Sequence, residues 1–334
     1  MKAVGFHAPS SIDAPNALVD LDLPKPSPTG RDLLVAVQAV SVNPVDVKVR
    51  ASRTPAQGRA EVIGWDAAGV VEAVGPEVTL FKVGDPVFYA GAINRSGSNA
   101  QFQLVDERIV GRRPSSLSVA EAAALPLTAI TAWELLFDRL GATKDTTGSL
   151  LVVGGSGGVG SILIQLARRL TGLTVIATAS RPETRDWCLQ LGAHHVVDHS
   201  GDLVAQVAAL DVPPVGLIAS LTNTADHFPA LMEIVAPQGR IGVIDDPKTL
   251  DVVPLKRKAV SLHWELMFTR ALFQTPDMIR QHELLNAVSD LIDEGRLKTT
   301  LTEVLTPINA ANLIKAHAAI ESGRTRGKIV LEGF

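Results

Sequence analysis

The stretch SLLVVGGSGGVGSILIQLA, residues 149–167, places a cluster of glycines between two apolar runs. The first run is short, apolar and partly β-branched, which predicts a buried strand. Apolar residues then recur at helical spacing, which predicts a helix from Gly158 to Leu170. The segment between them is therefore a turn that joins a strand to a helix.

Glycines in this turn follow the pattern G-x-G-x-x-G, at Gly155, Gly157 and Gly160. Between a strand and a helix, this pattern is typical of dinucleotide-binding proteins. The glycines permit a tight turn, close approach of the backbone to a pyrophosphate, and close packing of helix on strand. The helix N-terminus offers N–H groups to the phosphates. A plain flexible turn is the alternative. The predicted pyrophosphate turn comprises Ser156, Gly157, Gly158 and Val159.

Strands and helices alternate on the C-terminal side of this turn. Helices are predicted at 182–191, from 202 and from 225, and a further helix at 276–294. The strands between them are LTVIATAS, HHVVDHS, PVGLIASL and GRIGVID. Such alternation predicts an α/β fold with a doubly wound parallel Rossmann sheet covered by helices on both faces.

The first 120 residues have a different pattern, with short apolar runs separated by turn signals such as SPTGRD and VGDP. Many short strands with turns favour a compact β barrel or sandwich. The C-terminal tail returns to strands, TTLTEVLT and GKIVLEG, around a helix at 309–321. We therefore expect one β-rich domain from residues 1–122 and 296–334, and a nucleotide-binding domain from 123–295.

Composition excludes several classes of protein. The chain has 334 residues, a formal net charge of −4 and one cysteine, Cys188. A disulfide framework and a four-cysteine zinc site are therefore excluded. The acidic balance argues against a nucleic-acid partner, and no secretory signal or uninterrupted membrane-spanning stretch is evident. We expect a soluble, cytoplasmic protein.

The choice of cofactor depends on the end of the strand TVIATAS. An acidic residue there accepts from the ribose 2′-hydroxyl of NAD, whereas a basic environment suits the 2′-phosphate of NADP. Here the strand runs into Ser180 and Arg181, with no acid at its tip. Ser180 and Arg181 can bind a phosphate, so we expect NADPH. The alternative is that Arg181 is an ordinary solvated charge.

The sequence resembles the medium-chain dehydrogenase/reductase family along essentially its whole length. The resemblance depends on AAGVVEAVGPEVTLFKVGDPVF, VVGGSGGVGSILIQLA, SVNPVDVKVR and GKIVLEG. It is strongest to the quinone-oxidoreductase branch with its ζ-crystallin-like proteins. The segment GRIGVIDDPKTLDVVPLKRKAVSLHWELMFTR resembles a subgroup labelled zinc-type alcohol dehydrogenase-like. The resemblance implies that the β-rich domain is a GroES-like catalytic domain.

The residues argue against zinc despite that label. Zinc-using relatives place a Cys where this chain has Asn43, a His-Glu pair at Trp65-Asp66, and a further Cys just after residue 120. A zinc site needs three or four N, S or O ligands, and Asp66 alone does not supply them. The HHxxxH motif at residues 194–199 lacks a fourth ligand. We therefore expect a zinc-independent enzyme.

The resemblance places SVNPVDVKVR on the catalytic side of the first domain. Asn43 can donate an amide N–H, and Lys48 stands where several relatives carry a tyrosine. Lys48 could polarise a carbonyl or protonate the product; the alternative is an ion pair with Asp46. Trp65 and Tyr89 are candidates to stack on a flat ring, and for Trp65 core packing is the alternative.

The resemblance also implies the cofactor contacts. Thr128 matches a position at the nicotinamide end, and His199 stands where relatives have a tyrosine near the adenosine. Arg324 lies where a basic residue reaches the cofactor in some relatives. The remaining contacts are expected at strand ends, where such sheets bind ligands: Leu221, Thr222, Asn223 and Ile244.

These features together predict an NADPH-dependent reductase that transfers a hydride to a quinone or an activated alkene (enone) without zinc. One alternative is an alcohol or aldehyde dehydrogenase. Another is a non-catalytic, ζ-crystallin-like NADPH-binding protein. The strand-like VSLHWEL near residue 260 should be an exposed sheet edge, and edges invite pairing, so we expect a homodimer.

Overall fold

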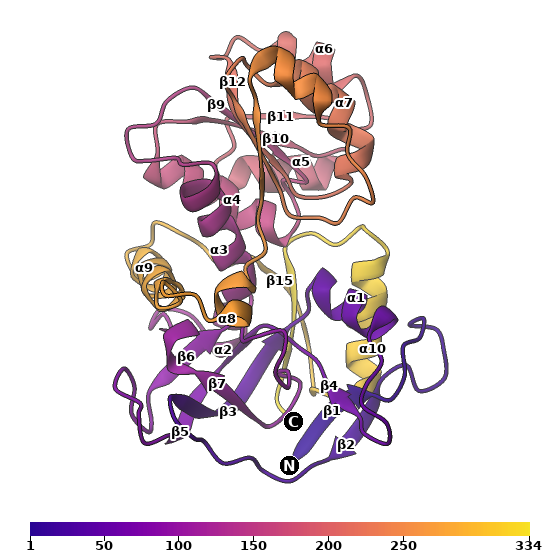
Figure 1. The fold of residues 1–334 in the computed structure, drawn as a ribbon, viewed down its shortest axis with the longest axis vertical. Coiled ribbons are helices and arrows are strands. Elements are labelled where there is room, and N and C mark those ends of the chain that lie inside the picture. The colour runs from indigo at the N-terminus through magenta and orange to yellow at the C-terminus, as the bar shows by residue number, and fades with distance from the viewer. The chain divides into compact units, whose positions relative to one another are not determined.

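A computed structural model describes the whole chain, Met1–Phe334, and Figure 1 shows its ribbon. The chain divides into two compact units. Unit 1 comprises Met1–Ile130 and Phe268–Phe334, and unit 2 comprises Thr131–Met267. The chain therefore passes between the units twice, at 130/131 and at 267/268.

Unit 2 is built on a six-stranded parallel sheet, as the alternation predicted. Its strand order is β11-β10-β9-β12-β13-β14. The strands are β9 (Ser149–Val153), β10 (Thr174–Thr178), β11 (His195–Val197), β12 (Val215–Ser220), β13 (Arg240–Val243) and β14 (Ser261–Trp264). The doubly wound parallel sheet is therefore confirmed.

Four helices connect the successive strands of this sheet. They are α4 (Gly158–Leu170), α5 (Pro182–Gln190), α6 (Leu203–Ala208) and α7 (Thr224–Ile234). Side chains of the strands form a core with α6 and α7, in which Leu151, Ile176 and Ile218 are fully buried. The 3-10 helix η3 (Val253–Lys258) precedes β14 at the sheet edge. Because β9 pairs with β10 on one side and β12 on the other, the strand order reverses between β9 and β12.

Unit 1 is β-rich, as the turn-punctuated pattern predicted. A seven-stranded sheet runs β15-β16-β3-β5-β6-β8, with β7 paired to β3, and a smaller sheet runs β2-β1-β4. The strands are β1 (Lys2–Phe6), β2 (Val19–Asp22), β3 (Asp32–Ser41), β4 (Glu61–Val62), β5 (Ala67–Val74), β6 (Pro86–Tyr89), β7 (Phe102–Asp106), β8 (Val110–Arg112), β15 (Leu301–Leu305) and β16 (Lys328–Glu332). Since β16 pairs antiparallel with β3, the C-terminal tail completes the seven-stranded sheet.

The helices of unit 1 lie around these sheets, as the lower part of Figure 1 shows. They are α1 (Pro44–Ser52), α2 (Val119–Ala123), η1 (Glu107–Ile109), α8 (Thr269–Phe273), α9 (Arg280–Asp293) and α10 (Ala310–Glu321). Helix α3 (Pro126–Trp133) crosses the unit boundary and continues as the π-helical turn η2 (Glu134–Arg139).

The unit boundaries differ from those predicted, which lay after residue 122 and before residue 296. Residues 268–295 belong to unit 1 because α9 packs on β8. Gly111 lies against the Leu285 side chain, and His282 Nδ1 is 2.7 Å from the Val110 carbonyl oxygen. Helical periodicity located α9 but carried no information about the sheet on which it packs.

One helical stretch, Val119–Arg139, is long and apolar enough to cross a membrane by length and composition. Its most apolar window is 83% buried within the structure. Such burial is typical of a core helix, which passes the same test of length and hydropathy.

Candidate functional site

The glycine turn of unit 2 has the geometry that its pattern predicted. Gly154 has φ +81°, which favours glycine. A Cβ on Gly160 would lie 2.4 Å from the Gly154 carbonyl oxygen, so only glycine fits where α4 approaches the turn. Helix α4 begins at Gly158, and no side chain caps its N-terminus. The N–H groups of its first turn have no helical acceptors and are available to an anion.

The structure brings the predicted strand-end residues of unit 2 to this same edge. Leu221 N–H donates to the Val153 carbonyl at the end of β9. The Thr222 methyl group lies 2.9 Å from where a Cβ of Gly154 would be, and Asn223 adopts a left-handed conformation at the start of α7. These residues flank the point where the strand order reverses, the usual dinucleotide crevice of such sheets. Ile244 follows β13, and its N–H donates to the Ser220 carbonyl.

Ser180 and Arg181 lie beyond the carboxyl end of β10, next to the end of β11. Ser180 is exposed, and Arg181 is the N-cap residue of α5. Arg181 Nε is 3.4 Å from Glu183 Oε1 in a pair that is about half exposed. Such exposed pairs contribute only ~0–1 kcal/mol, so a phosphate can compete for the guanidinium.

Two further groups lie near the ends of β10 and β11. Arg185, one turn further along α5, donates to the Val196 carbonyl at 3.1 Å. The His199 ring meets the His227 ring edge to face, with centroids 5.8 Å apart. Burial, followed by the neighbouring His227, lowers the pKa of His199. His199 is therefore favoured as a neutral ring at physiological pH.

Unit 1 contains a buried polar cluster built from Asn43, Asp66 and Lys328. Asn43 Nδ2 donates to Asp66 Oδ2 at 2.8 Å and to the Trp65 carbonyl at 3.3 Å. Lys328 Nζ lies 3.1 Å from Asp66 Oδ2 and donates to Asn43 Oδ1 and to the Val42 carbonyl. All three residues are at most 3% exposed. Asn43 therefore uses its amide within the protein on both its donor and its acceptor side.

Asp66 of this cluster and the nearby Asp46 both carry shifted pKa values. Burial raises the pKa of Asp46 to about 7, against the opposing effects of the Asn43 N–H and the Lys328 ammonium. Burial also raises the pKa of Asp66, while Lys328, Asn43 and the Leu127 N–H favour its charged form. Because the Lys328 ammonium is in direct contact with Asp66, it is the main counter-charge of the cluster.

Trp65 and Tyr89 are both fully buried. The Trp65 indole N–H donates to the Ala92 carbonyl at 3.2 Å, and its ring packs edge to face on Phe268 with centroids 6.1 Å apart. The Tyr89 hydroxyl has no hydrogen-bond partner, and burial raises its pKa. This geometry favours the core-packing alternative for Trp65.

The other predicted residues of unit 1 lie in different environments. Lys48 is exposed on α1, four residues beyond the Pro44 that begins the helix. Thr128 is buried, and its hydroxyl donates to the Leu125 carbonyl at 3.0 Å. Arg324 is exposed in the turn between α10 and β16. Lys328, four residues later, is the basic residue of this segment that reaches the buried cluster.

Lys328 was not identified from the sequence. It lies inside GKIVLEG, a typical buried strand, and a lysine there gives no local signal of a site. A charged residue directly before the apolar run IVL of this strand was the available clue, because buried lysines are almost always paired.

The donor set does not fit zinc. No group of three or more His, Cys, Asp or Glu side chains is arranged to hold a metal ion. Asp66 is the only carboxylate among Asn43, Trp65 and Asp66, and it is bound to Lys328. Zinc needs three or four such ligands, and the ammonium group already supplies the compensating positive charge.

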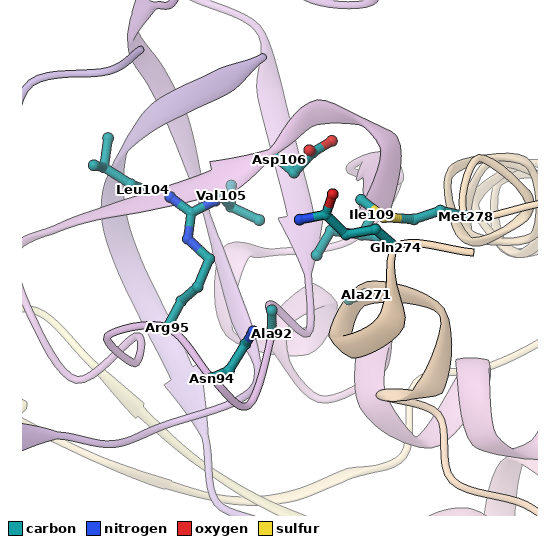
Figure 2. Close-up of a pocket in the computed structure, with 10 residues that line it drawn as sticks. All are labelled: Ala92, Asn94, Arg95, Leu104, Val105, Asp106, Ile109, Ala271, Gln274 and Met278. Carbon is teal, nitrogen blue, oxygen red and sulfur yellow. The ribbon is translucent and has the colours of Figure 1, made fainter. Parts of the chain in front are cut away.

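A pocket that is partly open to solvent lies in unit 1. Figure 2 shows Arg95 and Gln274 extending into it from opposite sides in that view. Its lining is mixed polar and apolar, and includes none of the four predicted catalytic residues. The lining residues are Ala92, Asn94, Arg95, Leu104, Val105, Asp106, Ile109, Ala271, Gln274 and Met278.

Comparison with known proteins finds two family models along the chain. The model of the alcohol dehydrogenase GroES-like domain matches residues 29–128, and the model described as zinc-binding dehydrogenase matches residues 191–331. A zinc-type alcohol dehydrogenase-like protein of Staphylococcus aureus is 42% identical over 336 residues, covering 99% of each chain. The 2-methylene-furan-3-one reductase of Solanum lycopersicum is 28% identical over 341 residues, covering 99% of this chain and 79% of the relative.

Solved structures agree with these matches. A Rhizobium etli protein, provisionally named a zinc-dependent alcohol dehydrogenase, is 60% identical with a TM-score of 0.98, covering 100% of this chain and 98% of that one. Escherichia coli quinone oxidoreductase, complexed with NADPH, shares the fold at 22% identity and a TM-score of 0.84, covering 99% of this chain and 100% of that one. The chain therefore belongs to the medium-chain dehydrogenase/reductase family of oxidoreductases, among its alcohol dehydrogenase-like members.

Proposed function

We propose that the protein is an NADPH-dependent reductase that transfers a hydride to a quinone or an enone without a metal ion. The observation that carries the proposal is the ion pair between Lys328 and Asp66, with Asn43 bound to both. Asn43 and Asp66 stand where, by the resemblance, zinc-using relatives carry a cysteine and the glutamate of a His-Glu pair, and Lys328 pairs with this Asp66. An internal ammonium group thus replaces the charge that a metal would bring.

The cofactor side of the proposal depends on the edge of unit 2. The glycine turn and the N-terminus of α4 fit a pyrophosphate, and the ends of β9 and β12 flank the crevice for the rest of the dinucleotide. A bound nicotinamide supplies the hydride. NADPH is favoured over NADH because Ser180 and Arg181 follow β10 where an acid would otherwise bind the ribose 2′-hydroxyl.

The substrate class follows from the donor set at Asn43, Trp65 and Asp66, which does not fit zinc. In a zinc enzyme the metal polarises the carbonyl that becomes an alcohol. An enone or quinone accepts hydride at carbon while its oxygen is stabilised by a hydrogen-bond donor or solvent. Lys48, exposed on α1, is the proposed donor. The tomato relative, a 2-methylene-furan-3-one reductase, acts on a substrate of this class.

The test is a spectrophotometric assay of NADPH oxidation with quinones, enones and aldehydes, each before and after exhaustive chelation. We expect quinones or enones to be reduced at an unchanged rate after chelation, with NADPH preferred to NADH. Loss of activity on chelation, or stoichiometric zinc in tag-free protein, would contradict the metal-free mechanism. Turnover of aldehydes alone would instead support an alcohol dehydrogenase, the activity that the names of the Staphylococcus aureus and Rhizobium etli proteins suggest.

No turnover of any substrate, together with tight NADPH binding, would support a non-catalytic binding protein.

We also propose a homodimer formed along β14, the edge strand of the sheet in unit 2. Trp264 and Leu266 are both more than half exposed there, and an open edge strand favours pairing. A dimer mass by light scattering at micromolar concentration is expected, and a monomer mass contradicts it.

A further inference from the structure

Two buried glutamates lie in unit 2 beside both chain connections to unit 1. Glu134 begins the turn η2, just after the connection at 130/131, and Glu265 follows β14, just before the connection at 267/268. Glu134 is fully buried and Glu265 is 4% exposed. Neither residue belongs to the nucleotide edge, which is the glycine turn with the strand ends proposed to bind NADPH, or to the cluster around Lys328.

The local backbone explains why these groups meet. Residues 134–139 form a π-helical turn, whose wider hydrogen-bond spacing brings residues five apart toward the same side. Glu134 and Arg139 therefore both face Glu265. Arg139 Nε donates to Glu265 Oε2 at 2.7 Å, and the Glu134 carboxyl lies within hydrogen-bond reach of Glu265.

A single shared proton removes the repulsion between the carboxyl groups of Glu134 and Glu265. Glu265 Oε1 has no hydrogen-bond donor, and two ionised carboxylates at this distance repel each other. A proton on either carboxyl group forms one O–H···O bond between them and leaves a single negative charge. Arg139 then balances that charge, so the buried group is neutral as a whole.

We propose that Glu134 and Glu265 share one proton, and that this bond is a pH-sensitive latch that ties together the two chain connections between the units. When the proton is present, η2 and the segment after β14 are joined by a short hydrogen bond. When it is lost, two like charges face each other at the base of both connections. The latch therefore restrains motion of one unit relative to the other only in its protonated state.

The surrounding charges within unit 2 set the pH range. Burial, followed by the charge of Glu134, raises the pKa of Glu265 to about 8, and Arg139 opposes this shift. The other basic groups nearby are His263 on β14 and Arg240 on β13, which donates to the Leu140 carbonyl. Burial lowers the pKa of His263, which keeps that ring neutral.

The sign of the pH dependence follows from this shift. Between the ordinary glutamate pKa of 4.5 and the raised pKa of Glu265, the folded protein binds a proton that the unfolded chain has released. Stability from this proton is complete below pH 4.5 and is lost as the pH rises through about 8. The latch should therefore hold at neutral pH and release in mildly alkaline solution.

The experiment measures the distance between spin labels on the two units as the pH is raised. Lys82→Cys in unit 1 and Lys144→Cys in unit 2 replace lysines whose side chains are about 85% exposed. The native Cys188 is buried and its thiol pKa is raised to about 12, so it stays unlabelled. We expect the distance distribution to change with a midpoint near pH 8.

Glu265→Gln places a permanent N–H donor between the two side chains, so the change near pH 8 should be lost. Glu134→Gln gives Glu265 a permanent donor and should also lose it, which keeps the test valid if one variant fails to fold. Glu183→Gln, an exposed control, should retain the change. A distribution constant from pH 6 to 10 in the parent protein, or an unchanged transition in both Gln variants, overturns the proposal. This experiment needs neither cofactor nor substrate, so it is independent of the proposed reductase activity.

Discussion

The nucleotide edge of unit 2 and the polar cluster of unit 1 are built in opposite ways. The edge is made of backbone: Gly154 and Gly160 let α4 approach β9, and the N–H groups of the helix end are the proposed binding groups. The cluster is made of side chains, because three separate segments contribute Asn43, Asp66 and Lys328.

This difference determines how each region tolerates change. A backbone site loses function when a side chain is added, because the added atoms occupy the space that a ligand or helix needs. A buried network of charges loses stability when a side chain is removed, because the remaining charges lose their partners. The predictions below test this contrast, from the largest expected effect to the smallest.

Lys328→Met should cause the largest loss. It leaves Asp66 buried without its counter-charge, and removing one partner of a buried pair costs ~3–5 kcal/mol of unfolding free energy. Urea denaturation at pH 7 measures the loss. Lys82→Met, at a lysine whose side chain is 85% exposed, is the matched control and should change stability by less than ~0.5 kcal/mol.

A double variant sharpens this test. Asp66→Asn with Lys328→Met removes both charges and should recover a large part of the lost stability. If Lys328→Met alone is neutral, the cluster is not held together by this ion pair, and the contrast between the two regions is wrong.

Lys48→Met should affect catalysis without affecting stability. If Lys48 meets the developing oxyanion, its removal lowers the rate of hydride transfer by ~10²–10³, while NADPH affinity is unchanged. Single-turnover kinetics at saturating NADPH measure the step, with affinity titrated separately. A loss within about threefold, the range of exposed ion pairs, would support the alternative that Lys48 pairs with Asp46.

Arg181→Ala should reduce the preference for NADPH over NADH. A charge-assisted hydrogen bond is worth ~1.5–3 kcal/mol, so the ratio of the two affinities should fall at least tenfold. Fluorescence titration with both cofactors measures the ratio. Arg185→Ala, one turn along α5 and bonded to Val196, is the matched comparison. If the ratio of NADPH to NADH affinity is unchanged in Arg181→Ala, Arg181 does not bind the 2′-phosphate.

Two glycine variants separate folding from binding at the nucleotide edge. A Cβ on Gly160 meets the Gly154 oxygen at 2.4 Å, so Gly160→Ala should lower stability by ~1–3 kcal/mol through overpacking. A Cβ on Gly157 lies 3.5 Å from that oxygen, so Gly157→Ala should fold normally and bind NADPH more weakly. Equal stability of the two variants would contradict the close approach of α4 to the turn.

Much of unit 2 could be predicted from local sequence. The helix at 158–170 has the predicted ends, and α5, α6 and α7 begin within one residue of the predicted starts. Each of these helices has apolar residues at helical spacing and begins after a turn or a capping residue. The further helix begins at Arg280 instead of Pro276, because periodicity locates a helix better than it locates its ends.

The sequence by itself determined the α/β class and the strand–turn–helix at Gly154–Gly160. These properties depend on residues that are close along the chain. Tertiary structure alone decided that Lys328 pairs with Asp66, that α9 packs on β8, and that Glu134 meets Glu265. Each of these contacts joins residues more than 100 positions apart, and at such separations only the packing of the sheets and helices determines which side chains become neighbours.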